Sequence, residues 1–213
     1  MRGSIFLAAF LAVFALGGTL AMASPLTDFA DAWGKVDDYT CTIAVHEALG
    51  NQTQDRHYDF AFKKPSMAHI EVTQGPGKGS GSVWHGGDTV RGHQGGILSG
   101  IKLTISINDP RAVTLRGDTI DTASFGYILG VYQSGKGTIT DAPGETIDGV
   151  STDKVTMQIA NAAANKNVSR DVLYLSKGTH LPVRRVRYEG DTLVKQEDFT
   201  NVKLNPGLKD SNF

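Results

Sequence analysis

An alternation of hydrophobic and polar residues runs from His57 to Val90. Its hydrophobic members fall at every second position within each segment: Tyr58, Phe60, Phe62, Ile70 and Val72. A period of two residues is typical of a β-strand that buries one face and exposes the other. A Lys-Lys-Pro corner divides the first two segments, and a glycine-rich loop leads to a third that ends at Trp84. We therefore expect three antiparallel strands here.

The same pattern predicts further strands on both sides of this stretch. They are expected at residues 38–48, 89–93, 101–107, 137–140, 151–159, 172–175, 183–188 and 193–204. Turn signals separate them at His85–Asp88, Pro143–Gly144 and Asp148–Gly149. Short strands with turns at this spacing are typical of an antiparallel meander.

Two segments have helical spacing instead. Phe29 and Trp33 follow Pro25 on one stripe of a short amphipathic helix. A second helix is expected over residues 119–132, with Ser124 as a capping residue and two interior glycines that weaken it. No repeat, charge block or linker divides the chain. The expected fold is mainly β (α+β): one antiparallel sheet curved into an incomplete barrel, with one or two helices over its concave face.

The first 23 residues have the features of a secretory signal peptide. They carry one arginine, an apolar run over residues 5–16 and the sequence Ala21-Met22-Ala23 before the expected cleavage site. An uncleaved membrane anchor is the alternative, but the run is shorter than the roughly 20 residues that a membrane span requires. No cysteine follows the run for lipid attachment. We expect a cleaved signal at 1–23 and one exported domain at 24–213.

Composition narrows the possible functions. The formal net charge of the 213 residues is −1, which argues against a nucleic-acid partner because such domains normally carry a basic excess. Cys41 is the single cysteine and shares a strand face with hydrophobic residues, so we expect a buried thiol without a disulfide. The six histidines are dispersed and lack metal-ligand spacing, so no metal or cofactor is expected.

Catalytic motifs are weak. Residues 130–137 match a phosphate-binding loop as far as Lys136, but Gly137 stands where that motif needs serine or threonine, so we interpret them as a helix end and a turn. No G-x-S-x-G motif occurs. His85 and Asp88 flank a turn, and we favour the simple interpretation that this turn is solvated. A contact of the two with His93 across the hairpin is the other option, and it leaves an exported hydrolase as a weaker alternative.

Three arginines lie close together on one predicted strand. Arg185 and Arg187 share a face, and Arg184 lies on the other. Such a cluster is suited to an anionic lipid headgroup or a protein partner. We favour the simpler interpretation, a solvated outer face whose arginines pair with the acidic residues nearby. Those acidic residues are Glu189, Asp191 and Glu197.

The order of elements resembles the LolA-like periplasmic lipoprotein carriers and their outer-membrane lipoprotein-sorting relatives. The resemblance rests on short motifs at Asp38-Tyr39-Thr40, Phe62-Lys63-Lys64-Pro65, Ile70-Glu71-Val72, Val83–Asp88 and Phe199–Leu208. It implies an incomplete barrel whose apolar concave face is covered by helices and holds acyl chains. One departure is His69, which stands where the carriers have an arginine.

The resemblance implies a periplasmic, non-catalytic carrier of a lipid or an acylated lipoprotein. We expect a monomer that works with a membrane-bound donor or acceptor protein. The apolar lining is expected from Phe29, Trp33, Ile43, Phe60, Phe62, Ile70, Val72, Trp84, Phe125 and Tyr127. Two alternatives stay open: these side chains pack together as an ordinary core, or the fold serves as an envelope protein-interaction module without a lipid.

Overall fold

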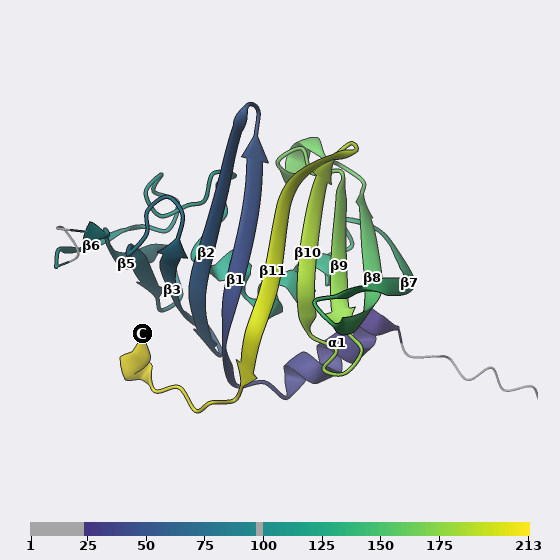
Figure 1. Ribbon diagram of the computed structural model, residues 1–213, viewed down its shortest axis with the longest axis horizontal. Helices are drawn as coiled ribbons and strands as arrows, with labels where there is room; N and C mark the ends of the chain where they lie inside the picture. The colour runs from purple at the N-terminus through teal and green to yellow at the C-terminus, as the bar shows by residue number, and fades with distance from the viewer. Residues whose placement is uncertain (1–23, 97–99) are drawn as a thin grey trace, which may run out of the picture.

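The computed structural model describes residues 24–96 and 100–213, so the expected signal peptide at 1–23 lies outside the described residues. The described chain forms one eleven-stranded antiparallel sheet that curves without closing (Figure 1). Its edges are β6 and β7, and its order is β6-β5-β4-β3-β2-β1-β11-β10-β9-β8-β7. The predicted fold class, a single antiparallel sheet forming an incomplete barrel with helices, is confirmed.

The elements have the following bounds. The strands are β1 (Asp38–Leu49), β2 (Gln52–Lys63), β3 (Met67–Gln74), β4 (Gly81–Trp84), β5 (Thr89–His93), β6 (Lys102–Ser106), β7 (Gly137–Ile147), β8 (Val150–Ile159), β9 (Arg170–Ser176), β10 (Pro182–Glu189) and β11 (Thr192–Leu204). The α-helices are α1 (Pro25–Gly34) and α2 (Phe125–Gln133). Short 3-10 turns are η2 (Ile120–Ala123), η3 (Ala163–Asn165) and η4 (Asp210–Asn212).

The first and last strands pair in the middle of the sheet. Strands β1–β6 and β7–β11 each form a meander of successive antiparallel neighbours, and the β1–β11 pair joins the two halves. In this pairing Tyr39 lies opposite Leu204, and Ile43 lies opposite Phe199. Every second side chain of each strand therefore points to the concave face, and these side chains line that face from one edge of the sheet to the other.

An aromatic cluster fills one end of the concave side, where α1 and α2 meet the sheet. Tyr39 and Phe125 stack with ring centroids 4.4 Å apart, and Trp33 contacts both rings edge-on. Phe62 and Phe199 complete the contacts around them. Offset and edge-to-face aromatic pairs of this kind stabilise a folded protein by more than the burial of their surface area alone provides. The cluster fixes both helices on the sheet.

Helix capping explains where the two α-helices begin. The side chain of Ser24 accepts a hydrogen bond from the Thr27 amide, and that of Ser124 accepts one from the Tyr127 amide, both at 3.2 Å. Serine is among the preferred N-cap residues because its hydroxyl satisfies a free amide of the first turn. Ser124 caps α2 as predicted, and the residues before it in the stretch 119–132 form η2 rather than α-helix.

The predicted turn at Pro143–Gly144 is wrong. Both residues lie inside β7, where the pairing with β8 shifts register between Pro143 and Thr146 as in a β-bulge. An edge strand tolerates proline there because its outward amide has no neighbour to bond. The β7–β8 hairpin turns at Asp148–Gly149, the other turn signal predicted in this region. Both residues have positive φ, as primed two-residue turns require.

Candidate functional site

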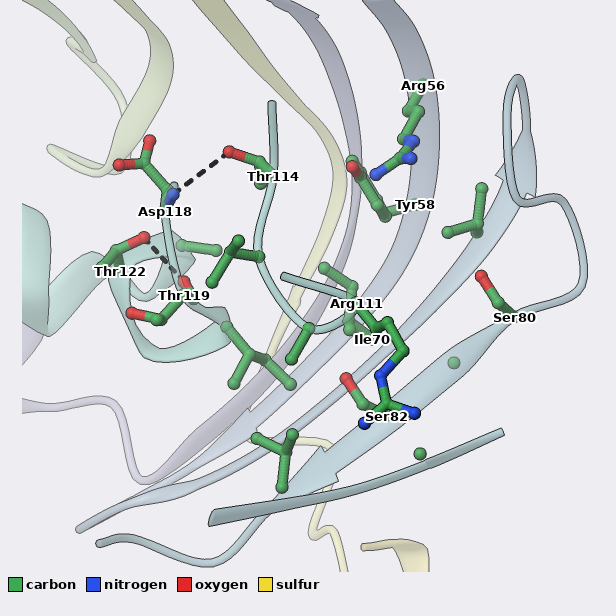
Figure 2. Close-up of a pocket in the computed structure, with 18 of the residues that line it drawn as sticks. Arg56, Tyr58, Ile70, Ser80, Ser82, Arg111, Thr114, Asp118, Thr119 and Thr122 are labelled. Atoms are coloured by element: carbon green, nitrogen blue, oxygen red, sulfur yellow. Dashed lines mark hydrogen bonds between the residues drawn. The ribbon is translucent and has the colours of Figure 1, made fainter. Parts of the chain in front are cut away.

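A cavity of about 340 Å³ lies between the β1–β6 half of the sheet and the chain that crosses it after β6 (Figure 2). We call residues 107–119 of that crossing segment the strap. Most of the cavity wall is apolar, and these side chains come from both sides: Ile43, Val45, Tyr58, Ile70, Val72, Val90, Ile101, Leu103 and Ile105 from the sheet, and Ala112, Val113, Ile120 and Ala123 from the strap and η2. A volume of this size is typical of small-molecule pockets.

The cavity reaches the edge strand β6, where its wall is exposed. The side chains of Ile101 and Leu103 line the cavity and are 56% and 47% exposed, respectively. Ile105, farther along the same strand, is half-buried and packs against the core. Exposed large apolar side chains that continue into an apolar cavity are typical of a ligand entrance.

The predicted lining residues divide into separate groups. Three of them, Ile43, Ile70 and Val72, line the cavity. Five others, all aromatic, belong to the packed core between the helices and the sheet: Phe29, Trp33, Phe60, Phe62 and Phe125. The structure therefore places the open space farther toward β6 than the aromatic strand pattern indicated.

The last two predicted residues lie away from the cavity wall. Trp84 packs against the core, and its indole Nε1 donates a 2.9 Å hydrogen bond to the carbonyl of Gly87 in the following turn. Tyr127 on α2 is 43% exposed and does not line the cavity. Sequence reasoning missed the strap contribution, because short apolar residues in a loop, such as Ala112 and Val113, give no periodic signal.

The strap is fixed to the sheet by polar contacts. The buried carboxylate of Glu47 on β1 accepts hydrogen bonds from the Thr114 hydroxyl at 2.8 Å and from the Leu115 amide at 3.1 Å. The buried guanidinium of Arg116 donates to the carbonyls of Ala48 and Lys166, at 2.6 and 3.0 Å. A loop held by buried hydrogen bonds of this kind has a defined position and forms a stable wall of the cavity.

Asp118, near the end of the strap, forms the centre of a buried ionic network. Its carboxylate accepts hydrogen bonds from Arg187, from Lys195 at 2.9 Å and from Lys166 at 2.9 Å. Burial by itself would raise the pKa of Asp118, but Lys195 and Arg187 outweigh it and hold that pKa well below its usual range. Glu197 lies 3.1 Å from Lys195 on the same strand. Asp118 is therefore a permanent anion at neutral pH.

The network continues across the concave face onto β9. Arg185 donates to both carboxylate oxygens of Asp171, with its shortest contact at 2.6 Å, and Tyr132 on α2 donates to the same carboxylate at 2.9 Å. The expected solvated outer face is wrong for Arg185 and Arg187, whose side chains are only 5% and 11% exposed. The alternation correctly put these two arginines on one face, but that face is buried because its carboxylate partners, Asp171 and Asp118, come from distant parts of the sequence.

Arg184 is the one arginine of the three that lies on the outer face, where it pairs with Asp198. On the concave face, the carboxylates of Glu47, Asp118, Asp171 and Glu197 are matched by the cations of Lys166, Arg185, Arg187 and Lys195. Three members, Asp118, Lys195 and Glu197, also contribute to the cavity wall. The cavity is thus apolar along most of its length, with a charge-balanced polar end.

The turn at His85–Asp88 is solvated, as favoured from the sequence, and the alternative contact between His85 and His93 does not form. His93 pairs with Gly81 at the far end of the β4–β5 hairpin from His85, which is exposed beside the turn. His93 lies 3.8 Å from Glu71 instead. Among residues 24–96 and 100–213, no group of three histidine, cysteine, aspartate or glutamate side chains is placed to hold a metal ion. The same residues include no helix long and apolar enough to cross a membrane.

Comparison with known proteins gives matches among solved structures. Neither the protein-family models nor the curated proteins that were searched give a match. The Pseudomonas aeruginosa MucA/MucB complex contains a chain that aligns over 89% of this chain and 60% of its own length, with a TM-score of 0.52 at 9% identity. A lipoprotein-sorting protein domain from Vibrio parahaemolyticus aligns over 88% and 94%, with a TM-score of 0.47 at 12% identity.

The LolA superfamily protein NE2245 from Nitrosomonas europaea aligns over 90% of this chain and 97% of its own, with a TM-score of 0.42 at 13% identity. The fold is LolA-like. At these identities the likeness concerns the fold alone. The LolA-like resemblance inferred from the sequence is confirmed for the fold, and the chain spans 60% of the MucB-complex chain that it matches.

Proposed function

We propose that this LolA-like protein is a non-catalytic carrier that binds an acyl chain of a lipid or lipoprotein in the cavity beneath the strap. The observation that carries the proposal is the cavity itself: it is lined by apolar residues, remains open in a sheet whose other end is filled by aromatic side chains, and continues to exposed apolar residues at β6. A hydrocarbon chain matches the apolar part of this surface, which makes up most of the cavity's length.

The free energy of such binding has a simple origin. Each methylene that leaves water for an apolar environment gains about 0.8 kcal/mol. No covalent chemistry is needed, because transfer requires only that the cavity open and close. The strap forms one wall of the cavity and is joined to the sheet through Glu47 and Asp118. Movement of the strap away from the sheet would open the cavity.

We place this carrier in the periplasm, exported by its first 23 residues, with an acylated lipoprotein or another envelope lipid as cargo. The apolar run at residues 5–16 and the LolA-like fold support this location. A membrane-bound donor or acceptor protein would complete the route. The printed names of the structural neighbours include lipoprotein-sorting proteins, and they supply the cargo class for this proposal.

Native mass spectrometry of residues 24–213, purified from a bacterial envelope without detergent, tests the proposal. We expect an added lipid or acyl-chain mass on the wild-type protein. Ile70→Glu places a charge in the cavity wall and should remove that mass. Val83→Glu is the matched control, because Val83 lies on the neighbouring strand opposite His69, on the other face of the sheet, and should keep it.

The result that would contradict the proposal is a bare protein that also fails to bind fluorescent fatty acids. Circular dichroism of both variants tests whether the fold persists. If it does, loss of the ligand in Ile70→Glu reports on the cavity. Equal retention of the ligand in the two variants would place it elsewhere on the protein.

The exposed edge of β6 favours a second candidate function, a protein-interaction module. An edge strand with free backbone groups can receive an added strand from a partner. Leu103 on β6 and Ile101 just before it are exposed at this edge. The MucA/MucB complex contains a chain of related fold together with another protein. Crosslinking from Thr104→Cys on this strand, in a Cys41→Ala background, would identify a protein partner. If no protein is crosslinked and the purified protein carries a lipid, the carrier function is favoured.

A further inference from the structure

One cation of the cavity wall lacks an acidic partner. Arg56 lies on β2 opposite Val45, and its side chain extends along the cavity with the guanidinium turned toward Tyr58 (Figure 2). Among residues 24–96 and 100–213, no carboxylate lies within 4.0 Å of this guanidinium. Its Nε atom is buried and has no hydrogen-bond partner in the described protein. A buried donor without an acceptor is unfavourable, so this position is suited to an acceptor from a ligand.

The other charged groups around the cavity are already neutralised. Arg111 pairs with Asp109 through two hydrogen bonds at 2.9 and 2.8 Å. His93 faces Glu71 at 3.8 Å. At the polar end, Lys195 contacts three carboxylates, those of Glu47, Asp118 and Glu197. Arg56 is therefore the cation of the wall that is available to a bound molecule, within the part of the chain that the structure describes.

The neighbours of Arg56 add a second donor. The hydroxyl of Tyr58 lies beside the guanidinium, and burial raises the pKa of Tyr58, so this hydroxyl keeps its proton at neutral pH. A planar guanidinium fork and a hydroxyl together match the oxygens of a carboxylate or phosphate group. From this point the apolar wall continues through Ile70 and Val72 toward β6.

We propose that the cavity selects an amphiphile with an anionic head, whose carboxylate or phosphate oxygens accept hydrogen bonds from Arg56 and Tyr58 while one hydrocarbon chain extends along Ile70 and Val72 toward the β6 edge. This inference rests on the proposed acyl-chain function and adds the headgroup chemistry and its orientation. A fatty acid and a monoalkyl phosphate share this chemistry, and the comparison of the two ligands separates them.

The test compares three ligands of equal chain length by displacement of a fluorescent fatty-acid analogue from residues 24–213. Hexadecanoic acid and hexadecyl phosphate carry the anionic head, and hexadecanol does not. We expect wild-type protein to bind the anionic ligands at least tenfold more tightly than the alcohol, since a charge-assisted hydrogen bond is about twice as strong as a neutral one. The tighter of the two anions identifies the head.

Variants then assign the effect to Arg56. Arg56→Met should remove the preference for the anions and leave the affinity for hexadecanol within about twofold. Arg56→Lys keeps the charge without the fork and should retain part of the preference. Arg111→Met is the matched control, because this cavity arginine is already paired with Asp109, and it should keep the full preference.

The outcomes separate the two proposals. Equal wild-type binding of acid, phosphate and alcohol would overturn headgroup recognition and leave the acyl-chain cavity intact. A preference that survives in Arg56→Met but disappears in Arg111→Met would also overturn it. Failure of the wild-type protein to bind any of the three ligands would contradict the proposed carrier function itself. The comparison of ligands on wild-type protein needs no folded variant.

Discussion

The hydroxyl of Tyr132 on helix α2 donates a 2.9 Å hydrogen bond to the carboxylate of Asp171 on strand β9, and both groups are buried. This contact ties the helix to the concave face at the point where Arg185 also binds the carboxylate. Burial raises the pKa of Tyr132 well above its usual range, and the negative charge of Asp171 adds to the effect, so the hydroxyl remains a donor at every physiological pH.

We expect Tyr132→Phe to lower the free energy of unfolding by about 1–3 kcal/mol, the usual contribution of a hydrogen bond to a charged group. Urea denaturation followed by circular dichroism measures this change. Tyr127→Phe on the same helix is the control, because Tyr127 is 43% exposed and should change stability by less than about 0.5 kcal/mol. Equal effects of the two variants would contradict a structural role for the contact.

The packing of α1 on α2 predicts opposite effects for two glycines of one helix. A Cβ atom at Gly126 would lie 2.9 Å from Cζ2 of Trp33, whereas one at Gly130 would meet nothing within 4 Å. Gly126→Ala should destabilise the protein by about 1–3 kcal/mol, since overpacking exceeds the gain in helix propensity. Gly130→Ala should stabilise it by up to about 1 kcal/mol.

Thermal unfolding of the two variants, measured side by side, checks the sign of each change. Stabilisation by Gly126→Ala would mean that the indole of Trp33 can move, and that the contact between the helices is looser than the structure indicates.

The buried ionic network predicts how stability depends on pH. The pKa of Asp118 in the folded protein lies below its ordinary value of 3.8, so its contribution to stability is complete above that value and is lost as the pH falls below it. Asp118→Asn should cost about 3–5 kcal/mol at pH 7, because Arg187 and Lys195 then lack a buried counter-ion. The difference from wild type should shrink as the pH is lowered from 5 toward 2.

Urea unfolding at a series of pH values measures this convergence. Asp55→Asn, which removes an exposed partner of His46, should change stability by only a small fraction of that amount. A difference for Asp118→Asn that stays constant down to pH 2 would contradict the assignment of Asp118 as a buried anion.

The thiol of Cys41 should be unreactive in the folded protein. Cys41 is 5% exposed, and burial, together with the nearby charge of Asp59, raises the pKa of the thiol. Since the thiolate is the reactive form, a disulfide reagent at pH 8 should label this residue only after addition of urea. Thr42→Cys in a Cys41→Ala background moves the thiol to the other face of β1 and should react in the native state. Rapid native labelling of Cys41 would contradict its burial.

The sequence was sufficient to predict the strands, because hydrophobic alternation is a local signal that reflects burial on one side. Alternation places Ile43, Ile70 and Val72 on the apolar strand face, and all three line the cavity. The buried thiol of Cys41 was also predicted correctly from its strand neighbours. These are properties of single strands and need no knowledge of distant partners.

The remaining features depend on pairings between distant residues. The sequence contained no signal that the strap would cover β1–β6, because Glu47 and Asp118 look like solvated residues until Thr114 and Lys195 are known to bind them. Arg185 and Arg187 were expected in solvent for the same reason. The open space lies toward β6 because the large aromatic residues fill the other end of the sheet.

The pairing of β1 with β11 has a consequence for the order of folding. Each half of the sheet grows from hairpins between neighbouring strands, but the join between Tyr39 and Leu204 closes a loop of nearly the whole domain, and such distant pairings form slowly. The cavity takes Ile43 and Val45 from β1 and Lys195 and Glu197 from β11. A chain still emerging from the ribosome thus lacks a finished cavity until its last strand is added.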